Sequence, residues 1–178
     1  EEQRFGVEHK EKLKEKYPLV NVLTLSATPI PRTLNMSLTG VRDISMLETA
    51  PRGRLPIQTY VVGYSDALCK DAITRELARG GQTLVLLNDI DALDAFASRI
   101  RQMCEGARVI TAHGQMAPGQ LEQRISAFYD KEFDVLVSTT IIENGIDLPD
   151  ANTLIVIDSG RFGLSQLYQL RGRVGRSN

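Results

Sequence analysis

The sequence contains no tryptophan, and it has only two cysteines and two histidines among 178 residues. So few cysteines exclude a fold built on disulfides, and the cysteines and histidines show no zinc-binding spacing. No apolar run approaches the length that crosses a bilayer, and no signal peptide opens the chain. We therefore expect a cytoplasmic protein with no membrane segment and no metal site of its own.

The charge is nearly balanced, with a formal net charge of -1. This balance argues against indiscriminate binding to nucleic acid, while a local basic track stays open. A hydrophobic fraction of 42% in 178 residues is enough for a packed core. The length predicts one domain, or one domain with part of another.

Strand-like and helix-like patterns alternate along most of the chain, which is typical of an α/β fold with a parallel sheet covered by helices. Short apolar runs predict strands at residues 57–62, 83–87, 109–111, 135–137 and 154–157, the last two buried on both faces. Helical spacing predicts three helices that bury, in turn, Leu68, Ala72, Ile73 and Leu77, then Leu93, Phe96, Ala97, Ile100 and Met103, then Leu121, Ile125 and Phe128. Ser65 is expected to cap the first helix, and Pro118 to begin the third. Cys69 and Cys104 lie on apolar helix faces, so both are expected in the core.

Residues 1–50 differ from the rest, because they hold one expected strand, at residues 22–25, among neighbouring helices. Residues 51–56 have the composition of a linker. A complete α/β unit is therefore expected at residues 57–178. Residues 1–50 are expected to be the trailing part of a preceding domain.

Near the carboxyl terminus, Arg171, Arg173 and Arg176 lie among glycines. A guanidinium binds phosphate through two hydrogen bonds, and glycine lets the backbone approach closely. Residues three apart, such as Arg173 and Arg176, share one helical face and can converge on one anion. The segment indicates nucleotide chemistry, and a solvated basic helix end is the alternative.

Four segments, in order, resemble motifs of the superfamily 2 helicases and translocases. Residues 1–3 resemble the second motif without its leading aspartate, and residues 26–34 resemble the third. Residues 135–147 resemble the fifth motif, and residues 166–176 resemble the sixth. Within the superfamily the sequence is most similar to the family of bacterial transcription-repair coupling factors, with RecG helicases next. The resemblance implies a complete second RecA-like motor domain, preceded by the C-terminal part of a first one.

The resemblance also implies roles around a bound nucleotide. Glu1 matches the acid that orients the attacking water, and Arg173 and Arg176 match arginine fingers for the γ-phosphate. Gly145 and Asp147 match the residues that approach the nucleotide and bond its ribose hydroxyl. Without the resemblance, Glu1 would be a frayed terminus and Asp147 the cap of a turn.

Other matched residues contact DNA or couple it to the nucleotide. The coupling positions are Gln3, Ser26, Thr28 and Gln169. Thr139 matches a residue that contacts a backbone phosphate, Arg32 is a candidate for a second phosphate contact, and Gly114 precedes a helix N-terminus whose amides suit a phosphate. The alternatives are a strand-end cap for Ser26 and Thr28, and a surface salt bridge for Arg32.

The cofactor implied by these matches is ATP with Mg²⁺. No glycine-rich loop ending in GKT or GKS occurs in the sequence, and the motif II aspartate that would hold Mg²⁺ lies outside it. The 178-residue chain is therefore expected to be an excised part that does not hydrolyse ATP at a meaningful rate.

Three functions stay open. The first is the motor part of an ATP-dependent double-stranded DNA translocase that displaces stalled RNA polymerase and couples transcription to nucleotide excision repair, with those proteins bound through domains outside the sequence. The second is a fork-remodelling DNA helicase of the RecG type. The third is a non-catalytic RecA-like module that binds nucleic acid. Residues 35–44 favour the first, and a phosphate-binding loop upstream would exclude the third.

Overall fold

The computed structural model describes residues 6–23, 45, 56–140 and 150–175, and the statements below concern these residues. The chain divides into two compact units, Glu1–Ala50 and Pro51–Asn178. The first unit contains the exposed helix α1 (Val7–Lys16), in which Lys12 and Glu8 form an ion pair of 3.2 Å. No described helix is long and apolar enough to cross a membrane. The assignment of the units to two motor domains stays a prediction.

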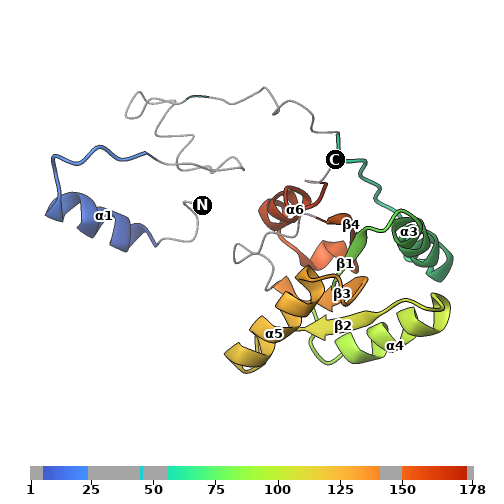
Figure 1. Cartoon of the computed structure of the whole chain (residues 1–178). Helices are drawn as coiled ribbons and strands as arrows, with labels where there is room; N and C mark the ends of the chain where they lie inside the picture. The colour runs from blue at the N-terminus through green and yellow to red at the C-terminus, as the bar shows by residue number, and fades with distance from the viewer. Residues whose placement is uncertain (1–5, 24–44, 46–55, 141–149, 176–178) are drawn as a thin grey trace. The chain divides into compact units, whose positions relative to one another are not determined.

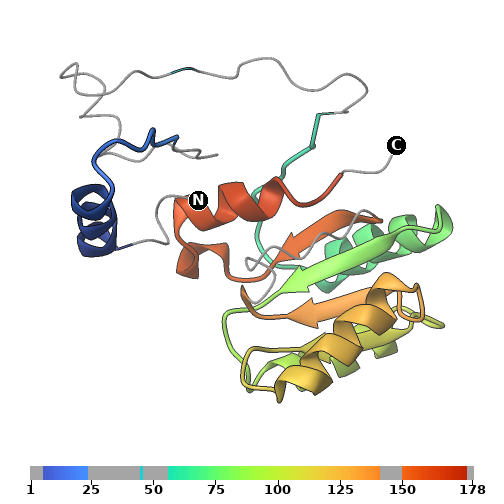
Figure 2. The same ribbon diagram turned by 60° about the vertical axis from the view of Figure 1, so that its left-hand side comes forward.

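The second unit is built on a sheet of four parallel strands in the order β2-β3-β1-β4. The strands are β1 (Gln82–Leu86), β2 (Val109–Ala112), β3 (Val135–Ser138) and β4 (Ala151–Val156). The helices α3 (Asp66–Ala78) and α4 (Leu93–Met103) cover one face, and α5 (Pro118–Tyr129) and α6 (Leu164–Arg171) cover the other (Figure 1). The short 3-10 helix η3 (Ser159–Arg161) connects β4 to α6. The same two layers of helices are visible from a second direction in Figure 2. The expected parallel sheet flanked by helices is confirmed.

Each strand sends alternate side chains into two separate cores, as the two-residue period of a strand requires. Val85 and Val137 pack on the α3 and α4 side, whereas Leu84 and Leu136 pack around Phe128 of α5. Cys69 and Cys104 are buried free thiols in the first core, as predicted, and burial raises the pKa of the Cys69 thiol to about 11. The cysteines therefore act as small core residues.

Two strand predictions are wrong. Residues 57–62 form no strand, and the neighbouring side chains of Val61 and Val62 are 89% and 67% exposed. Because successive residues of a strand face opposite sides, exposure of both means that neither side packs on a core. The last strand, β4, lies at the edge of the sheet and is half-buried, whereas a central strand was predicted. In the first unit, Val22 and Leu23 are exposed and form no strand, and residues 24 and 25 lie outside the described residues.

One helix-face prediction is also wrong, because Leu68 of α3 is 52% exposed. The fully buried residues of α3 are Cys69, Ile73 and Glu76. Of the other predicted residues, Ile73 is therefore confirmed, and Ala72 and Leu77 are half-buried. Glu76 is 1% exposed, and its carboxylate accepts hydrogen bonds from Arg79 and from the Thr153 hydroxyl of β4. A buried carboxylate is tolerated here because both of its oxygens have donors.

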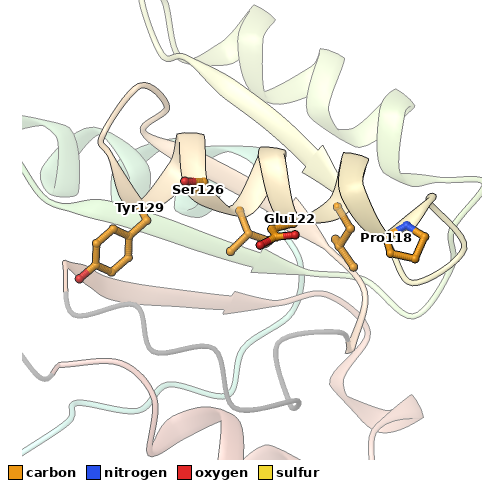
Figure 3. A pocket seen from close by; sticks show the side chains of 6 residues that line it. Pro118, Glu122, Ser126 and Tyr129 are labelled. Carbon is orange, nitrogen blue, oxygen red and sulfur yellow. The ribbon is translucent and has the colours of Figure 1, made fainter.

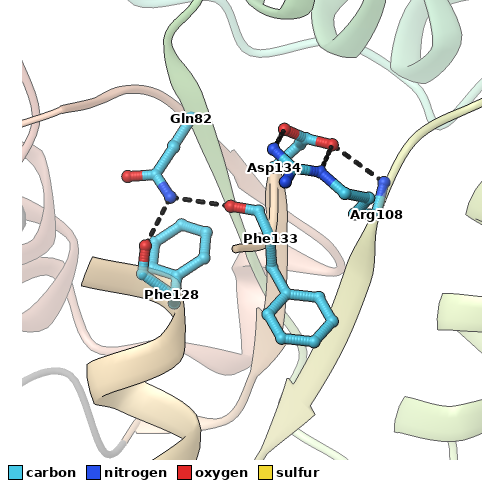
Figure 4. Close-up of polar contacts among 5 residues, drawn as sticks. All are labelled: Gln82, Arg108, Phe128, Phe133 and Asp134. Atoms are coloured by element: carbon cyan, nitrogen blue, oxygen red, sulfur yellow. Dashed lines mark hydrogen bonds and ion pairs between the residues drawn. The ribbon is translucent and has the colours of Figure 1, made fainter. Parts of the chain in front are cut away.

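All four strands begin at one edge of the sheet, called here the amino edge, and its polar groups are paired within the chain. Gln82 is 4% exposed, and its amide nitrogen donates to the carbonyl oxygens of Phe128, at 2.6 Å, and Phe133, at 2.7 Å (Figure 4). Beside it, Arg108 donates to both carboxylate oxygens of Asp134, with the shorter contact at 2.6 Å. These contacts fix the segments that enter β1, β2 and β3.

Candidate functional site

The opposite edge of the sheet, called here the carboxyl edge, is where all four strands end in one row. Ser138 pairs with Leu86 and with Ala112, and Leu86 pairs with Val156 on its other side. The residues that follow these four therefore emerge side by side. In open parallel α/β sheets this edge is where ligands bind.

The connection from β2 to α5 is a five-residue loop, residues 113–117. It contains a turn in which the Met116 amide donates to the His113 carbonyl at 3.2 Å. Pro118 occupies the first turn of α5, as predicted, and no side chain caps that end of the helix. Pro118 has no amide hydrogen, and the Gln120 and Leu121 amides donate to the Ala117 carbonyl at 2.9 and 3.0 Å. The Gly119 amide remains in this first turn as a candidate donor to an anion. The exposed Gly114 lies in this loop.

Two buried polar atoms lie beside this loop. Ser138 is fully buried, and neither its hydroxyl oxygen nor His113 Nδ1 has a hydrogen-bond partner among the described residues. Because Ala112 and Ser138 are paired, His113 and Thr139 follow them at neighbouring positions. Unsatisfied buried polar groups are rare, so their presence here points to an external partner.

The carboxyl edge thus brings together Gly114 and Thr139, both predicted to contact a DNA phosphate. Thr139 is half-buried directly after β3, and Gly114 is exposed two residues after β2. Hydroxyl and amide donors suit a phosphate oxygen. The described residues hold no group of three His, Cys, Asp or Glu side chains that fits a metal ion. The local chemistry of this edge favours an anion.

The arginine-rich segment follows α6. Gln169 lies in the helix, and Leu170 and Val174 are 1% and 3% exposed, so the segment is anchored to the core. Arg173 is half-buried, with its Nε covered by protein. The helix ends at Arg171, so the predicted shared helical face of Arg173 and Arg176 is wrong.

The backbone after α6 contains two glycines, Gly172 and Gly175. The Gly172 amide still donates to the Tyr168 carbonyl, at 3.1 Å, and Gly175 then has a φ of 68°. A positive φ is a left-handed conformation that cannot continue a right-handed helix, and glycine adopts it without strain. The role predicted for Arg173 stays a prediction.

The remaining predicted site residues lie outside the described part of the chain. They are Glu1, Gln3, Ser26, Thr28, Arg32, Gly145, Asp147 and Arg176. Their roles stay predictions.

An open and mostly apolar hollow runs along the exposed side of α5 (Figure 3). Its lining consists of Pro118, Leu121, Glu122, Ile125, Ser126 and Tyr129. No cluster of donors converges on it, as an anion site would require. The hollow is therefore distinct from the polar carboxyl edge.

The sequence prediction missed Ser138, although it belongs to the segment quoted for the fifth motif. The available signal was its position, because a serine at the end of the apolar run of β3 places a hydroxyl in a buried strand. It also missed Thr111 with its partners Asp94 and Arg124. These contacts join three separate elements, and no local pattern reports them.

A parallel sheet with anion-binding groups at its carboxyl edge defines an α/β domain of the nucleotide- or nucleic-acid-binding class. The chain belongs to the helicase conserved C-terminal domain family, whose family model matches residues 65–178. The expected relationship to superfamily 2 helicases and translocases is confirmed.

Curated relatives named transcription-repair-coupling factor match the whole chain. The protein of Bacillus subtilis is 58% identical over 178 residues, and that of Staphylococcus aureus is 53% identical. The chain spans 15% of the length of each of these relatives. A solved structure of RecG bound to a three-way DNA junction is 34% identical, with a TM-score of 0.69, and the match covers 88% of this chain and 21% of that one.

Proposed function

We propose that this chain is part of an ATP-dependent motor that moves along double-stranded DNA, and that its carboxyl edge contacts the DNA backbone. The observation that carries this proposal is the row of strand ends. In this row, Gly114 and Thr139 lie at neighbouring positions, and no side chain caps the start of α5. Two buried polar atoms of the same row, Ser138 Oγ and His113 Nδ1, have no hydrogen-bond partner among the described residues. Amide and hydroxyl donors that read phosphate without reading bases suit a protein that must move along any sequence.

The names of the relatives support a finer proposal. In it, the full-length protein displaces stalled RNA polymerase and couples transcription to nucleotide excision repair, through domains outside this sequence. The support is the identity of 58% to a transcription-repair-coupling factor over every residue of the chain.

ATP is the proposed cofactor, and bound ATP would supply the free energy for movement. Gly145, Asp147, Arg173 and Arg176 are proposed to hold the nucleotide, Glu1 to orient water, and Gln3, Ser26, Thr28 and Gln169 to couple the two sites. Arg173 fits this role chemically, because a half-buried guanidinium donates strongly to phosphate oxygens. Arg32 is proposed as a further phosphate contact. The ligands of Mg²⁺ are proposed to lie outside the sequence, so the 178-residue chain alone should not hydrolyse ATP.

A fork-remodelling helicase is the second candidate function. It is favoured by the RecG structure, which is 34% identical over 88% of the chain. The same carboxyl edge would then contact the arm of a DNA junction.

The first experiment measures ATP hydrolysis by the full-length protein that carries this sequence, with and without duplex DNA. Duplex DNA should stimulate hydrolysis, and Arg173→Ala should lower the stimulated rate by about 10³-fold, as expected for an arginine finger. Arg161→Ala is the matched control, because Arg161 is exposed and pairs only locally with Asp158. Equal rates for both variants would contradict the proposal.

A second experiment separates the two candidate functions. The same protein is given a stalled RNA polymerase on duplex DNA and, separately, a DNA fork without polymerase. Release of the polymerase supports coupling to transcription, whereas remodelling of the fork alone supports the RecG-type function. A non-catalytic module would do neither.

A further inference from the structure

Thr111, the third residue of β2, is the centre of a polar network at the outer edge of the sheet. Its side chain is almost fully buried, at 6% residue exposure. The Thr111 hydroxyl donates to Asp94 Oδ1 at 3.0 Å and accepts from Arg124 Nη1 at 3.0 Å. The same Arg124 nitrogen donates to the Thr111 carbonyl at 2.7 Å. Thr111 therefore links the acidic side chain of Asp94 in one helix to the basic side chain of Arg124 in another.

The network wraps around the edge of the sheet. Asp94 lies in the first turn of α4, which packs on one face, and Arg124 lies in α5, which packs on the other. The strand between them, β2, has a neighbouring strand on one side only. A neutral hydroxyl placed between opposite charges holds both helices against the end of this strand.

The position of the network relative to the loop gives it a consequence for binding. Thr111 and Arg124 are 13 residues apart, and the loop of residues 113–117 lies between them. The Arg124 contacts therefore close the loop at its base. They fix the distance between the end of β2 and the start of α5, the two elements that carry the loop. Binding groups are accurate only when the residues beneath them are held in place.

The same strand provides an internal comparison. Arg101 of α4 donates to the Val109 carbonyl at 2.8 Å, two residues before Thr111. This is the same kind of bond, from an arginine to a carbonyl of β2, but it spans only the connection from α4 to β2. If the Thr111 contacts only covered the edge of the sheet, their loss should affect DNA binding no more than loss of the Arg101 contact does.

We propose that Arg124 and Asp94, acting through the Thr111 hydroxyl, are positioning residues that hold the loop of residues 113–117 in the geometry that binds a DNA phosphate. The proposal rests on the proposed function of the carboxyl edge. None of the three side chains needs to touch DNA for this role. Their effect on binding passes through the backbone of the loop and the Gly119 amide at the start of α5.

The test measures binding of the full-length protein to a short fluorescent DNA duplex by anisotropy, at one fixed salt concentration. Thr111→Val keeps the shape and removes the hydroxyl together with its hydrogen bonds to Asp94 and Arg124, and it should weaken binding about fivefold. Thr111→Ser restores the hydroxyl and should bind within about twofold of wild type. A purely structural loss at this position would not be rescued selectively by the hydroxyl.

Arg101→Gln is the matched control, and hydrogen exchange of the β2 amides is measured on every variant. Arg101→Gln and Thr111→Val should both speed exchange, because both lose a bond to the edge strand, but only Thr111→Val should weaken DNA binding. Equal DNA affinity of Thr111→Val and wild type would overturn the proposal, as would equal weakening by Arg101→Gln.

A third variant separates this proposal from the function on which it rests. Thr139→Val removes a direct phosphate contact of the carboxyl edge. If Thr139→Val weakens binding and Thr111→Val does not, only the positioning role fails. If neither variant changes the affinity for duplex DNA, the carboxyl edge is not the contact surface, and both proposals fail.

Discussion

The polar groups at the two edges of the sheet differ in whether they have hydrogen-bond partners within the described chain. At the amino edge, Gln82 and Asp134 find partners within the chain, at 2.6 to 2.7 Å for their shortest contacts. At the carboxyl edge, Ser138 Oγ and His113 Nδ1 are buried without a partner among the described residues, and no side chain caps α5. The same strands thus begin in contacts that stabilise the fold and end beside buried polar atoms that have no hydrogen-bond partner among the described residues.

This difference predicts that equivalent substitutions have different effects at the two edges. A buried donor that serves two carbonyls is needed for stability, because its loss leaves both carbonyls buried and unpaired. A buried hydroxyl without an internal partner already carries a desolvation cost, so its removal should cost the fold nothing. Changes at the amino edge should therefore lower stability, and changes at the carboxyl edge should lower binding.

The largest effect on stability is expected for Gln82→Leu at the amino edge. It leaves the Phe128 and Phe133 carbonyls without their donor, at a cost of about 2 to 4 kcal/mol in the free energy of opening. Hydrogen exchange of the β1 and β3 amides in the full-length protein measures this cost. Gln123→Leu is the control, because Gln123 is exposed on α5. Unchanged exchange in Gln82→Leu would contradict the stabilising role of the Gln82 contacts at the amino edge.

The next effect is expected for Thr139→Val at the carboxyl edge. The Thr139 hydroxyl is proposed to donate to a DNA phosphate, so its loss should weaken duplex DNA binding about tenfold, with little change in amide exchange. Anisotropy of a labelled duplex measures the affinity. Thr153→Val is a contrasting variant, because the Thr153 hydroxyl donates to Glu76 within the fold. It should lower stability and leave DNA affinity unchanged, and the reverse pattern would contradict the comparison.

A smaller effect is expected for Ser138→Ala. Removing an unpaired hydroxyl from a fully buried site should leave the opening free energy unchanged or raise it by about 1 kcal/mol. DNA binding should weaken if the hydroxyl serves the ligand. Exchange of the β3 amides and duplex anisotropy report the two quantities separately. A marked loss of stability would show that Ser138 has a partner within the fold.

The smallest effect is expected for Asp134→Asn and depends on pH. Burial tends to raise the pKa of Asp134, but hydrogen bonds from the Arg108 side chain and backbone outweigh it, and the pKa is lowered. A lowered pKa in the fold contributes stability above the unfolded value of about 3.9, and this contribution disappears as the pH falls through the folded pKa.

Asp134→Asn should therefore be less stable than wild type at pH 7 by at most about 1 kcal/mol, and the difference should vanish well below pH 4. Exchange of the β3 amides measured at several pH values tests this. Asp158→Asn is the control, because its ion pair with Arg161 is exposed at both partners. A difference that grows as the pH falls would have the wrong sign.

Much of the second unit was predictable because its signals are local. Pro118 marks the start of α5, and the apolar run of β3 predicts a buried strand, as observed. The position of β4 at the sheet edge was not predictable, because strand order depends on contacts between distant segments. The apolar content of residues 57–62 predicts a strand, but a strand also needs a neighbour to pair with.

The candidate site was predictable only in part. Gly114 was predicted from its place between a strand and a helix start, and Thr139 from the resemblance to the fifth motif. The register of β2 and β3 explains why they lie at neighbouring positions. The Thr111 network was hidden, because its partners are 13 and 17 residues away and lie on opposite faces of the sheet. The path after α6 could not be predicted either, since α6 ends at Arg171, before the helical pattern that the arginine spacing had indicated.

The most direct test of the central claim is hydrogen exchange of the full-length protein with and without a saturating DNA duplex. DNA should slow the amides of residues 113–117, 119 and 120 and of Thr139, at the carboxyl edge, and leave those of Gln82 and Asp134, at the amino edge, unchanged. Slowing at the amino edge with none at the carboxyl edge would contradict the account.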